Sequence, residues 1–396
     1  MKSQCRDKLN VVVIGSGMYV CGRGTESYGT IIPALFEWKK KTGKLGELYV
    51  AGRSVEGIKD AKIKIGQIQG DMGTGGFVRY YPEGKDDPDC FKKAIRAIPH
   101  PACAIVAVPD NLHKKVAACA IKNGLHTLVV KPLVPTVKET LELIGLQKRK
   151  KVHCAVEFHK RHDHANLKMK DAIERGDIGD ILYFIVEFSQ RKSIPTKVFR
   201  KWVKSTNIFQ YLGIHYLDII YFLTKAVPVR VMATGQKRWL RAQGVDTYDS
   251  IEAVIEWRGR RGNRFVSHIL TNWVDPEKTS AMSDQRIKVI GTKGRFESDQ
   301  KYRGIKIVTD VSGLEEPNPY FCGSYGPKGE VSYKGYGIDS IHQFLNDVVQ
   351  VEGGIATLGE LEDNRATFTQ SVIPAYVLEA VNRSLGQKNR WVEIKI

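Results

Sequence analysis

The sequence predicts two domains: an α/β domain with a doubly wound parallel sheet, and an α+β domain with an open, largely antiparallel sheet. Three observations support this. Over residues 10–158, short apolar β-branched runs alternate with longer amphipathic runs. Beyond residue 158, strand-like runs follow one another without regular helices between them. The length of 396 residues allows two or three domains. We therefore expect one domain over residues 1–155 and another over 156–396.

The first domain contains six expected strands, each a short apolar run bounded by turn residues. They are residues 10–14, 47–52, 76–81, 102–108, 125–130 and 152–158. The clearest helix is 110–123, because Leu112, Val116 and Ala120 recur at helical spacing and Gly124 follows as a stop.

The second domain begins with an expected helix and continues mostly as strands. The helix is 164–176, and the strands are 180–190 and runs near 229–235, 251–257, 265–272, 286–290 and 304–309. The Pro and Gly content of 312–330 predicts a loop, and two further helices are expected at 338–350 and 361–385.

Composition limits the partners and the compartment. The chain has 61 Lys and Arg against 43 Asp and Glu, a net charge of +18, but these residues are spread along the chain without a nucleic-acid-binding motif. Its seven cysteines form no C-x-x-C pair and several lie in apolar strands, which is typical of reduced cysteine in a cytoplasmic protein. Without a nucleic-acid-binding motif we expect no nucleic acid as partner. No run approaches 18 apolar residues, so we expect no membrane as partner either.

The first strand runs into a glycine loop, "VVVIGSGMYVCGRG", that resembles a dinucleotide-binding turn but has Val20 where G-x-G-x-x-G has its third glycine. Helical periodicity resumes only near Tyr28, so we interpret the loop as expanded by about ten residues. In such a loop, backbone amides receive the pyrophosphate. The alternative is a turn without a ligand. The residues expected to contact cofactor here are Gly15, Gly17, Met18 and Arg23.

The second strand ends in "VAGRS", which offers Arg53 and Ser54 and no carboxylate before Glu56. A carboxylate at this position binds the ribose hydroxyl of NAD, whereas an arginine accommodates the 2′-phosphate of NADP. We therefore predict NADP as the preferred cofactor, with NAD as the alternative. A solvated surface arginine is the other interpretation of Arg53.

Lys131 and Pro132 directly follow the fifth strand, at the sheet edge where open α/β proteins bind ligands. Several ordered motifs accompany this pair. They are Pro109 and His113, Asn123-Gly124 with His126, Val130-Lys131-Pro132, residues 156–181, "LGIHYLDIIYFL" (212–223) and "IKVIGTKGRFESD" (287–299). With these motifs the chain resembles the Gfo/Idh/MocA family of NAD(P)-dependent sugar and inositol oxidoreductases.

The resemblance implies an N-terminal Rossmann domain, and a second domain whose open sheet faces the nicotinamide and commonly forms the interface of a homo-oligomer, a dimer or tetramer. Pro109, His113 and Lys131 would lie at the cofactor. Lys131 would hydrogen-bond the reacting hydroxyl, and His215, in Gly213-x-His-x-x-Asp218, would exchange its proton. A histidine suits this task because its pKa lies near neutral pH.

Two positions depart from the family pattern. Val130 replaces a glutamate that in the family helps to hold the lysine or the cofactor ribose. Tyr211 stands four residues before His215, where many members have a catalytic Asp. Tyr211 is expected either to act as an acid/base group or to stack on a sugar face.

Further substrate contacts are expected at Arg161 and His159, with a surface cluster as the alternative, and at Trp202, whose ring would stack on a sugar. The histidine spacing over 159–164 matches no common metal site, so no metal is predicted. The expected activity is hydride transfer at a secondary alcohol or ketone of a carbohydrate, cyclitol or sugar derivative. The alternatives are dinucleotide-dependent glycoside cleavage through transient oxidation and a non-catalytic dinucleotide sensor.

Overall fold

The computed structural model describes residues 8–396 and divides into two compact units. The first unit comprises the residues up to Val134, Lys138–His162 and Tyr320–Ser371. The second comprises Pro135–Val137, Asp163–Pro319 and Val372–Ile396. The boundary expected after residue 155 falls inside the first unit, which also takes a segment from the C-terminal part of the chain.

The first unit is built on a six-stranded, fully parallel sheet in the order β3-β2-β1-β4-β5-β6. This is the strand order of a dinucleotide-binding doubly wound fold. The strands are β1 (Leu9–Ile14), β2 (Leu45–Ala51), β3 (Val78–Tyr81), β4 (Ala102–Val106), β5 (His126–Val130) and β6 (Cys154–Glu157). All six expected strands are confirmed. The inner strands are mostly buried apolar runs between helices, and the edge strand β3 is half-buried.

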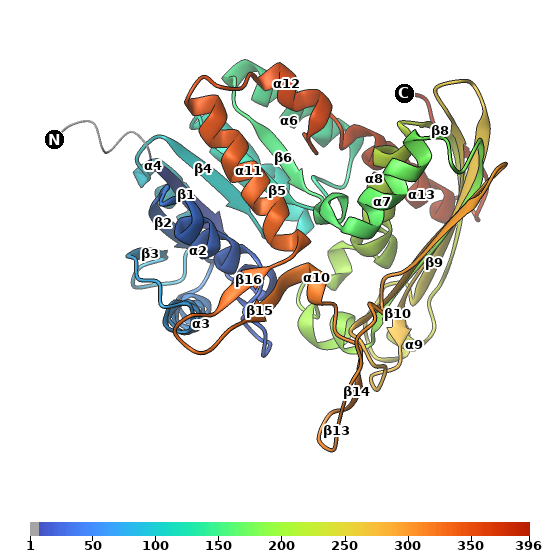
Figure 1. The fold of residues 1–396 in the computed structure, drawn as a ribbon. Coiled ribbons are helices and arrows are strands. Elements are labelled where there is room, and N and C mark those ends of the chain that lie inside the picture. Colours follow the sequence, from blue (N-terminus) through green and yellow to red (C-terminus); the bar gives the residue numbers. More distant parts are fainter. Residues whose placement is uncertain (1–7) are drawn as a thin grey trace. The chain divides into compact units, whose positions relative to one another are not determined.

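Helices cover both faces of this sheet (Figure 1). They are α1 (Met18–Cys21), α2 (Ile31–Thr42), α3 (Val55–Met72), α4 (Cys90–Ala97), α5 (His113–Lys122) and α6 (Val137–Lys150). The single turn η1 (Asp110–Leu112) leads into α5, and Gly124 ends that helical segment with a φ of 78°. The stop predicted at Gly124 is therefore confirmed.

One sheet face is covered by α2, α3 and a helix from the C-terminal segment, α11 (Tyr336–Glu352). Ile338, Ile341 and Phe344 of α11 lie in the same apolar cluster as Val11 and Val13 of β1. The same C-terminal segment contributes β15 (Gly323–Tyr325), β16 (Ser332–Lys334) and α12 (Leu358–Asn364). The apolar core of the first unit is therefore completed by residues more than 300 positions from its first strand.

The second unit is built on a seven-stranded sheet in the order β12-β11-β7-β10-β9-β8-β17. Only β7 and β10 run parallel; the other neighbours are antiparallel. The strands are β7 (Ile181–Arg191), β8 (Val227–Gln236), β9 (Ser250–Arg258), β10 (Arg264–Asp275), β11 (Ser283–Gly291), β12 (Arg295–Asp299) and β17 (Val392–Glu393). The open, largely antiparallel sheet is confirmed.

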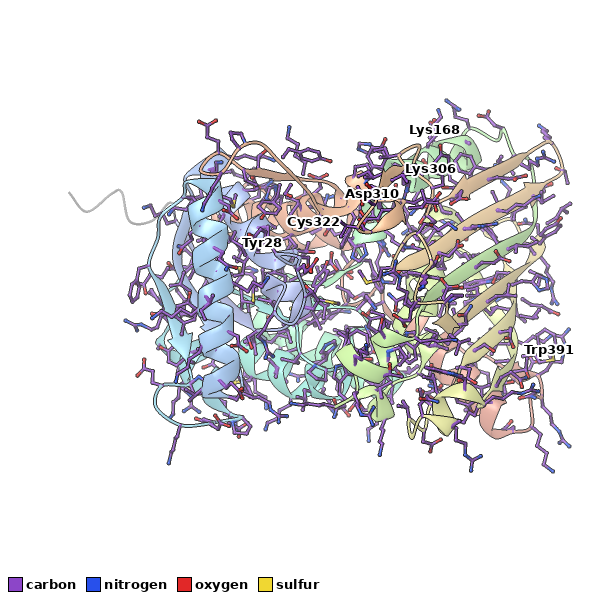
Figure 2. The ribbon with its side chains drawn as sticks, turned by 90° about the horizontal axis from the view of Figure 1, so that it is seen from below. Tyr28, Lys168, Lys306, Asp310, Cys322 and Trp391 are labelled. Atoms are coloured by element: carbon purple, nitrogen blue, oxygen red, sulfur yellow. The ribbon has the colours of Figure 1, made fainter. Side chains whose placement is uncertain are left out.

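Helices cover one face of this second sheet. They are α7 (His164–Glu174), α8 (Ile214–Thr224) and α13 (Val372–Gly386), with the short α9 (Trp239–Ala242) near one end. The strands alternate buried and exposed residues, so the other face meets solvent in the described chain. At the sheet edge Trp391, labelled in Figure 2, packs under the Arg230 guanidinium at 4.5 Å from the ring centroid. Over residues 8–396, no helix combines the length and apolar character needed to cross a bilayer.

Several expectations for the C-terminal part differ from the structure. The run 312–330, expected as a loop, contains two short strands, Gly313–Glu315 and Gly323–Tyr325, and the short helix Pro319–Cys322. The run 304–309 forms only β13 (Ile307–Thr309), which pairs with β14 (Gly313–Glu315) in a separate hairpin. The strand β12 was not expected, because its polar residues show no apolar run. The single helix expected over 361–385 is broken between α12 and α13, where Pro374 lies in the first turn of α13. Proline suits a first turn but breaks a helix interior.

Candidate active site

The glycine loop leaves β1 through two glycines with different tasks. Gly15 has a φ of 128°, and a Cβ there would lie 2.1 Å from the carbonyl oxygen of Ala107. Gly17 has extended backbone, and a Cβ would meet nothing within 4 Å. Gly15 is thus required for close packing of two strand ends, whereas Gly17 leaves open space through which a ligand can approach the backbone.

The expanded loop is built from a short helix and a turn. The four-residue α1 follows Gly17 and buries Val20 in the core, so Val20 does not take the place of the third glycine. Gly22 then reverses the chain with a φ of 75°. Arg23 donates a hydrogen bond of 2.7 Å to the carbonyl of Ser16, and its guanidinium lies 3.9 Å from the Asp60 carboxylate. The guanidinium of Arg23 is therefore held against the glycine turn, and its proposed phosphate contact stays a prediction.

At the end of β2, Arg53 is exposed and Ser54 caps α3. The Ser54 hydroxyl accepts a hydrogen bond from the amide of Gly57 at 3.2 Å. This capping bond uses one lone pair of the hydroxyl and leaves its O–H as a donor. The exposed guanidinium beside a helix N-terminus is suited to an anion such as a phosphate.

Lys131 is the first residue after β5 and lies among carboxylates of the same unit. Burial lowers the pKa of the Lys131 ammonium to about 8, while the negative charges of Asp110 and Glu157 raise it. Asp110 opens η1 after β4, and Glu157 ends β6. Neighbouring strand ends therefore bring together a lysine and two buried carboxylates, as the carboxyl edge of a parallel sheet allows.

His113 connects the two chain segments beside this lysine. Its Nδ1 lies 2.7 Å from the carbonyl oxygen of Pro132, and its Nε2 lies 2.8 Å from the carbonyl oxygen of Val108. The ring is fully buried. These contacts position the Pro109 turn and the Lys131-Pro132 turn, so His113 shapes the site through the backbone; direct contact with a cofactor stays a prediction.

Glu157 lies in a buried polar and aromatic cluster with His159. Its Oε2 is 3.0 Å from His159 Nδ1, and its Oε1 accepts a hydrogen bond of 2.7 Å from the Ser340 hydroxyl on α11. The His159 ring stacks on Tyr336, with centroids 5.8 Å apart, and lies near Tyr19 of α1. Burial and the charge of Glu157 raise the pKa of Tyr19, which therefore keeps its proton.

Arg161 is buried in the turn η2 (His159–His162). Its Nη1 donates a hydrogen bond of 3.1 Å to Gln370. The alternative in which Arg161 and His159 form a surface cluster is wrong, because both side chains are buried. The described contacts of Arg161 anchor the 365–371 turn, and its contact with a substrate stays a prediction.

The C-terminal segment also reaches the glycine loop. The Cys322 thiol donates to the carbonyl of Gly29 at 3.4 Å, and the Tyr28 hydroxyl donates to Asp71 at 2.7 Å. Figure 2 labels Tyr28 and Cys322 in the first unit. The end of the expanded loop is therefore held by the C-terminal segment at Gly29 and by α3 at Tyr28.

In the second unit, His215 lies in the first turn of α8, a helix that is almost wholly buried. The side chain of His215 is 5% exposed, and its ring centroid lies 6.2 Å from that of Phe188. Asp218 is three residues on, on the same helix face, and also buried. Gly213 allows the helix start to pack against Phe209, because a Cβ would come within 2.8 Å of that ring.

Tyr211 belongs to an aromatic cluster in the same unit. Its ring centroid lies 4.8 Å from Phe199, 6.2 Å from Trp202 and 5.8 Å from Trp273. The cluster therefore brings together Tyr211 and Trp202, and the stacking of these rings on a sugar stays a prediction. Asn207, in the loop before it, accepts a bond from the Gln210 amide and so caps the turn.

Sequence reasoning missed Asp110, Glu157 and Tyr19. A carboxylate at the end of an apolar strand, as in "CAVEF", is a signal that could have identified Glu157. The aromatic contribution of Tyr336 and the hydroxyl of Ser340 had no such signal, because they come from a helix far along the chain.

The first unit has the architecture of a dinucleotide-binding α/β protein: a glycine turn after β1, an exposed arginine after β2 and a half-buried lysine after β5 in a 3-2-1-4-5-6 sheet. Family comparisons agree with this class. The family "Oxidoreductase family, NAD-binding Rossmann fold" matches residues 81–158, and the "GFO/IDH/MocA C-terminal domain" matches residues 166–297. The chain belongs to the Gfo/Idh/MocA family.

Individual relatives are more distant. The chain is 28% identical over 195 residues to a scyllo-inositol 2-dehydrogenase (NAD(+)) of Bacillus subtilis, covering 48% of this chain and 53% of the relative. It is 29% identical over 161 residues to a scyllo-inositol 2-dehydrogenase (NADP(+)) of the same organism, covering 38% and 44%. The match thus spans about half the length of these relatives.

Solved structures share the fold over almost all of the described chain. The crystal structure of a scyllo-inositol dehydrogenase from Lactobacillus casei, with bound NAD(H) and scyllo-inositol, superposes with a TM-score of 0.66. That match covers 98% of this chain and 99% of the other, at 14% identity. The likeness shows a shared fold.

Proposed function

We propose that this chain is an NADP-preferring oxidoreductase that transfers hydride between the nicotinamide and a secondary alcohol or ketone carbon of a sugar, a cyclitol or a sugar derivative. The observation that supports it most is Lys131, a half-buried lysine at the carboxyl edge of the parallel sheet whose ammonium is under the influence of the Asp110 and Glu157 carboxylates. The family's relatives named above act on inositols with NAD(+) or NADP(+).

The residues of the first unit fit a dinucleotide. The open space beside Gly17 lets the backbone approach a pyrophosphate, whereas a side chain there would fill it. The exposed guanidinium of Arg53, next to the capped start of α3, suits the 2′-phosphate of NADP. When bound, the dinucleotide supplies the hydride donor or acceptor.

Lys131 is the group we assign to the reacting oxygen. Its Nζ would donate a hydrogen bond to that oxygen and stabilise the negative charge that develops there. A pKa of about 8 keeps most of the side chain charged at neutral pH, so it can act as donor.

His215 is the group we assign to the proton. During oxidation its imidazole would accept the hydroxyl proton, and during reduction it would return it. The substrate ring would stack on the aromatic cluster of Tyr211 and Trp202. Tyr211 then serves as a packing residue, with acid/base action as the alternative.

We also propose that the open face of the second sheet mediates a homo-oligomer. Ile185 of β7 and Leu270 of β10 are 37% and 38% exposed on that face. Apolar side chains exposed on a sheet face favour burial against a partner. Light scattering after size exclusion measures the assembly; a monomer at micromolar concentration would contradict it.

The test of the activity is a titration of the purified protein with NADPH and NADH, followed by nicotinamide fluorescence. We expect tighter binding of NADPH, and then absorbance change at the nicotinamide band with one or more members of an inositol and sugar panel. Leaving-group release without net absorbance change would instead support glycoside cleavage, and binding without any turnover would support a sensor. Failure to bind either dinucleotide would overturn the proposal.

A further inference from the structure

We propose that Glu157, at the end of β6, is the positioning residue for Lys131, in place of the carboxylate that the family pattern puts directly before the lysine and that is Val130 here. This inference rests on the proposed function and identifies how this chain holds its candidate catalytic lysine.

Strand register places Glu157 where that carboxylate is needed. In the parallel pair of β5 and β6, Val130 is the register partner of Glu157. Register partners in neighbouring strands point to the same face of a sheet and lie about 5 Å apart. The negative charge therefore lies on β6 and not on β5, at the same height along the strands as position 130.

Position 130 has a different use in this chain. Val130 packs against the apolar cluster that includes Leu128, Ala155 and residues of α11. A carboxylate at 130 would compete with this packing, because burial of a charge among apolar groups is costly. Moving the charge to β6 separates the apolar contact from the electrostatic one.

Glu157 is fixed in a way that suits a positioning residue. Its side chain is only 3% exposed, and each carboxylate oxygen has its own partner, Ser340 for Oε1 and His159 for Oε2. Buried carboxylates persist in proteins only when such partners and a positive charge compensate for lost hydration.

Several ionisable groups lie around Lys131 and Glu157. Among them, Glu157 supplies the negative charge that acts on the Lys131 ammonium from β6. Asp110 faces Lys131 from η1, while His159 and His162 of η2 and Tyr19 of α1 surround Glu157. Burial lowers the pKa of His162 to about 4, so this histidine adds no positive charge near neutral pH. Burial alone would drive the Lys131 ammonium toward its neutral form; Asp110 and Glu157 oppose this.

The test compares Glu157→Gln with a double variant, Val130→Glu/Glu157→Gln, that returns the carboxylate to the neighbouring strand. The matched control is Glu352→Gln, because the Glu352 carboxylate bonds His126 at the opposite end of β5, 2.7 Å away. Circular dichroism and thermal unfolding establish that each variant is folded.

The first readout is the pKa of Lys131, measured without substrate or cofactor from the pH dependence of its acetylation, with mass spectrometry of the Lys131 peptide. We expect the value to fall below that of the wild type in E157Q, to recover in the double variant and to stay unchanged in E352Q. An unchanged pKa in folded E157Q would overturn the inference, even if the double variant did not fold.

The second readout is kcat against KM on the substrate found by the panel. E157Q should lower kcat by about a hundredfold, since a misplaced catalytic group costs this much, with little change in dinucleotide affinity. The double variant should restore most of it. Wild-type protein that binds no dinucleotide would refute the proposed function, while the labelling result would still decide the role of Glu157.

Discussion

The two units assemble their candidate catalytic groups in different ways. In the first unit, the surroundings of Lys131 come from four separate places: η1, β5, β6 and, through Ser340, α11. In the second unit, His215 and the aromatic cluster around Tyr211 come mostly from one stretch, residues 199–218, with Trp273 added from β10. The first arrangement is therefore sensitive to substitutions far along the chain, and the second mainly to local ones.

The largest expected effect is a loss of kcat on substitution of Lys131 in the first unit or His215 in the second. Lys131→Ala and His215→Ala should each lower kcat by about 10²–10⁴-fold, because each removes a group that stabilises charge or moves a proton. Titration with NADPH should show nearly unchanged binding for both variants. A wild-type rate in either variant would remove that residue from the mechanism. The comparison would then lack a catalytic group in the first unit (Lys131) or in the second (His215).

The glycine turn offers a matched pair within the first unit. Gly15→Ala should lower the free energy of unfolding by about 3 kcal/mol, because of the positive φ and the contact with Ala107. Gly17→Ala should change it by less than about 0.5 kcal/mol and weaken dinucleotide binding instead. Denaturant unfolding and fluorescence titration separate the two effects. Equal loss of stability in both variants would contradict the assignment of Gly17 to the ligand.

A smaller effect is expected at the end of β2. Arg53→Ala should weaken NADPH binding by about tenfold to a hundredfold, the usual value of a hydrogen bond to a charged group. NADH binding should stay as in the wild type, since NADH lacks the 2′-phosphate. Parallel titrations measure both. Equal losses for NADPH and NADH would refute the contact with the phosphate.

The smallest effect is expected in the aromatic cluster. Tyr211→Phe keeps the ring contacts with Phe199 and Trp202 and removes only the hydroxyl. If Tyr211 packs and does not move a proton, kcat should fall far less than the roughly hundredfold loss typical of a missing acid/base group. Steady-state rates from pH 6 to 9 decide this, with Tyr211→Ala as the variant that also removes the ring. A large loss in the phenylalanine variant would favour acid/base action.

Local sequence patterns predicted much of the fold. The strands β1 to β6 are short apolar runs, and Gly213-x-His215-x-x-Asp218 fixes the spacing on α8 from a few adjacent residues. Other features depend on contacts between distant segments. The break between α12 and α13 accompanies an ion pair of Arg365 with Asp347 at 2.7 Å. The position of Glu157 beside Val130 follows only from the register of β6 with β5. Periodicity carries no information about such pairings.

The contribution of α11 to the first core has a consequence for biosynthesis. Residues 1–155 contain every strand of the parallel sheet except the second half of β6, yet Ile338, Ile341 and Phe344 must still arrive to cover one face. During translation α2 and α3 can cover their part of that face early, but the part under α11 stays uncovered until most of the chain has been synthesised. Domains that complete late expose apolar surface for longer and depend more on chaperones. A truncated chain that ends near residue 155 should therefore aggregate, and the dinucleotide-binding unit is best produced as part of the full chain.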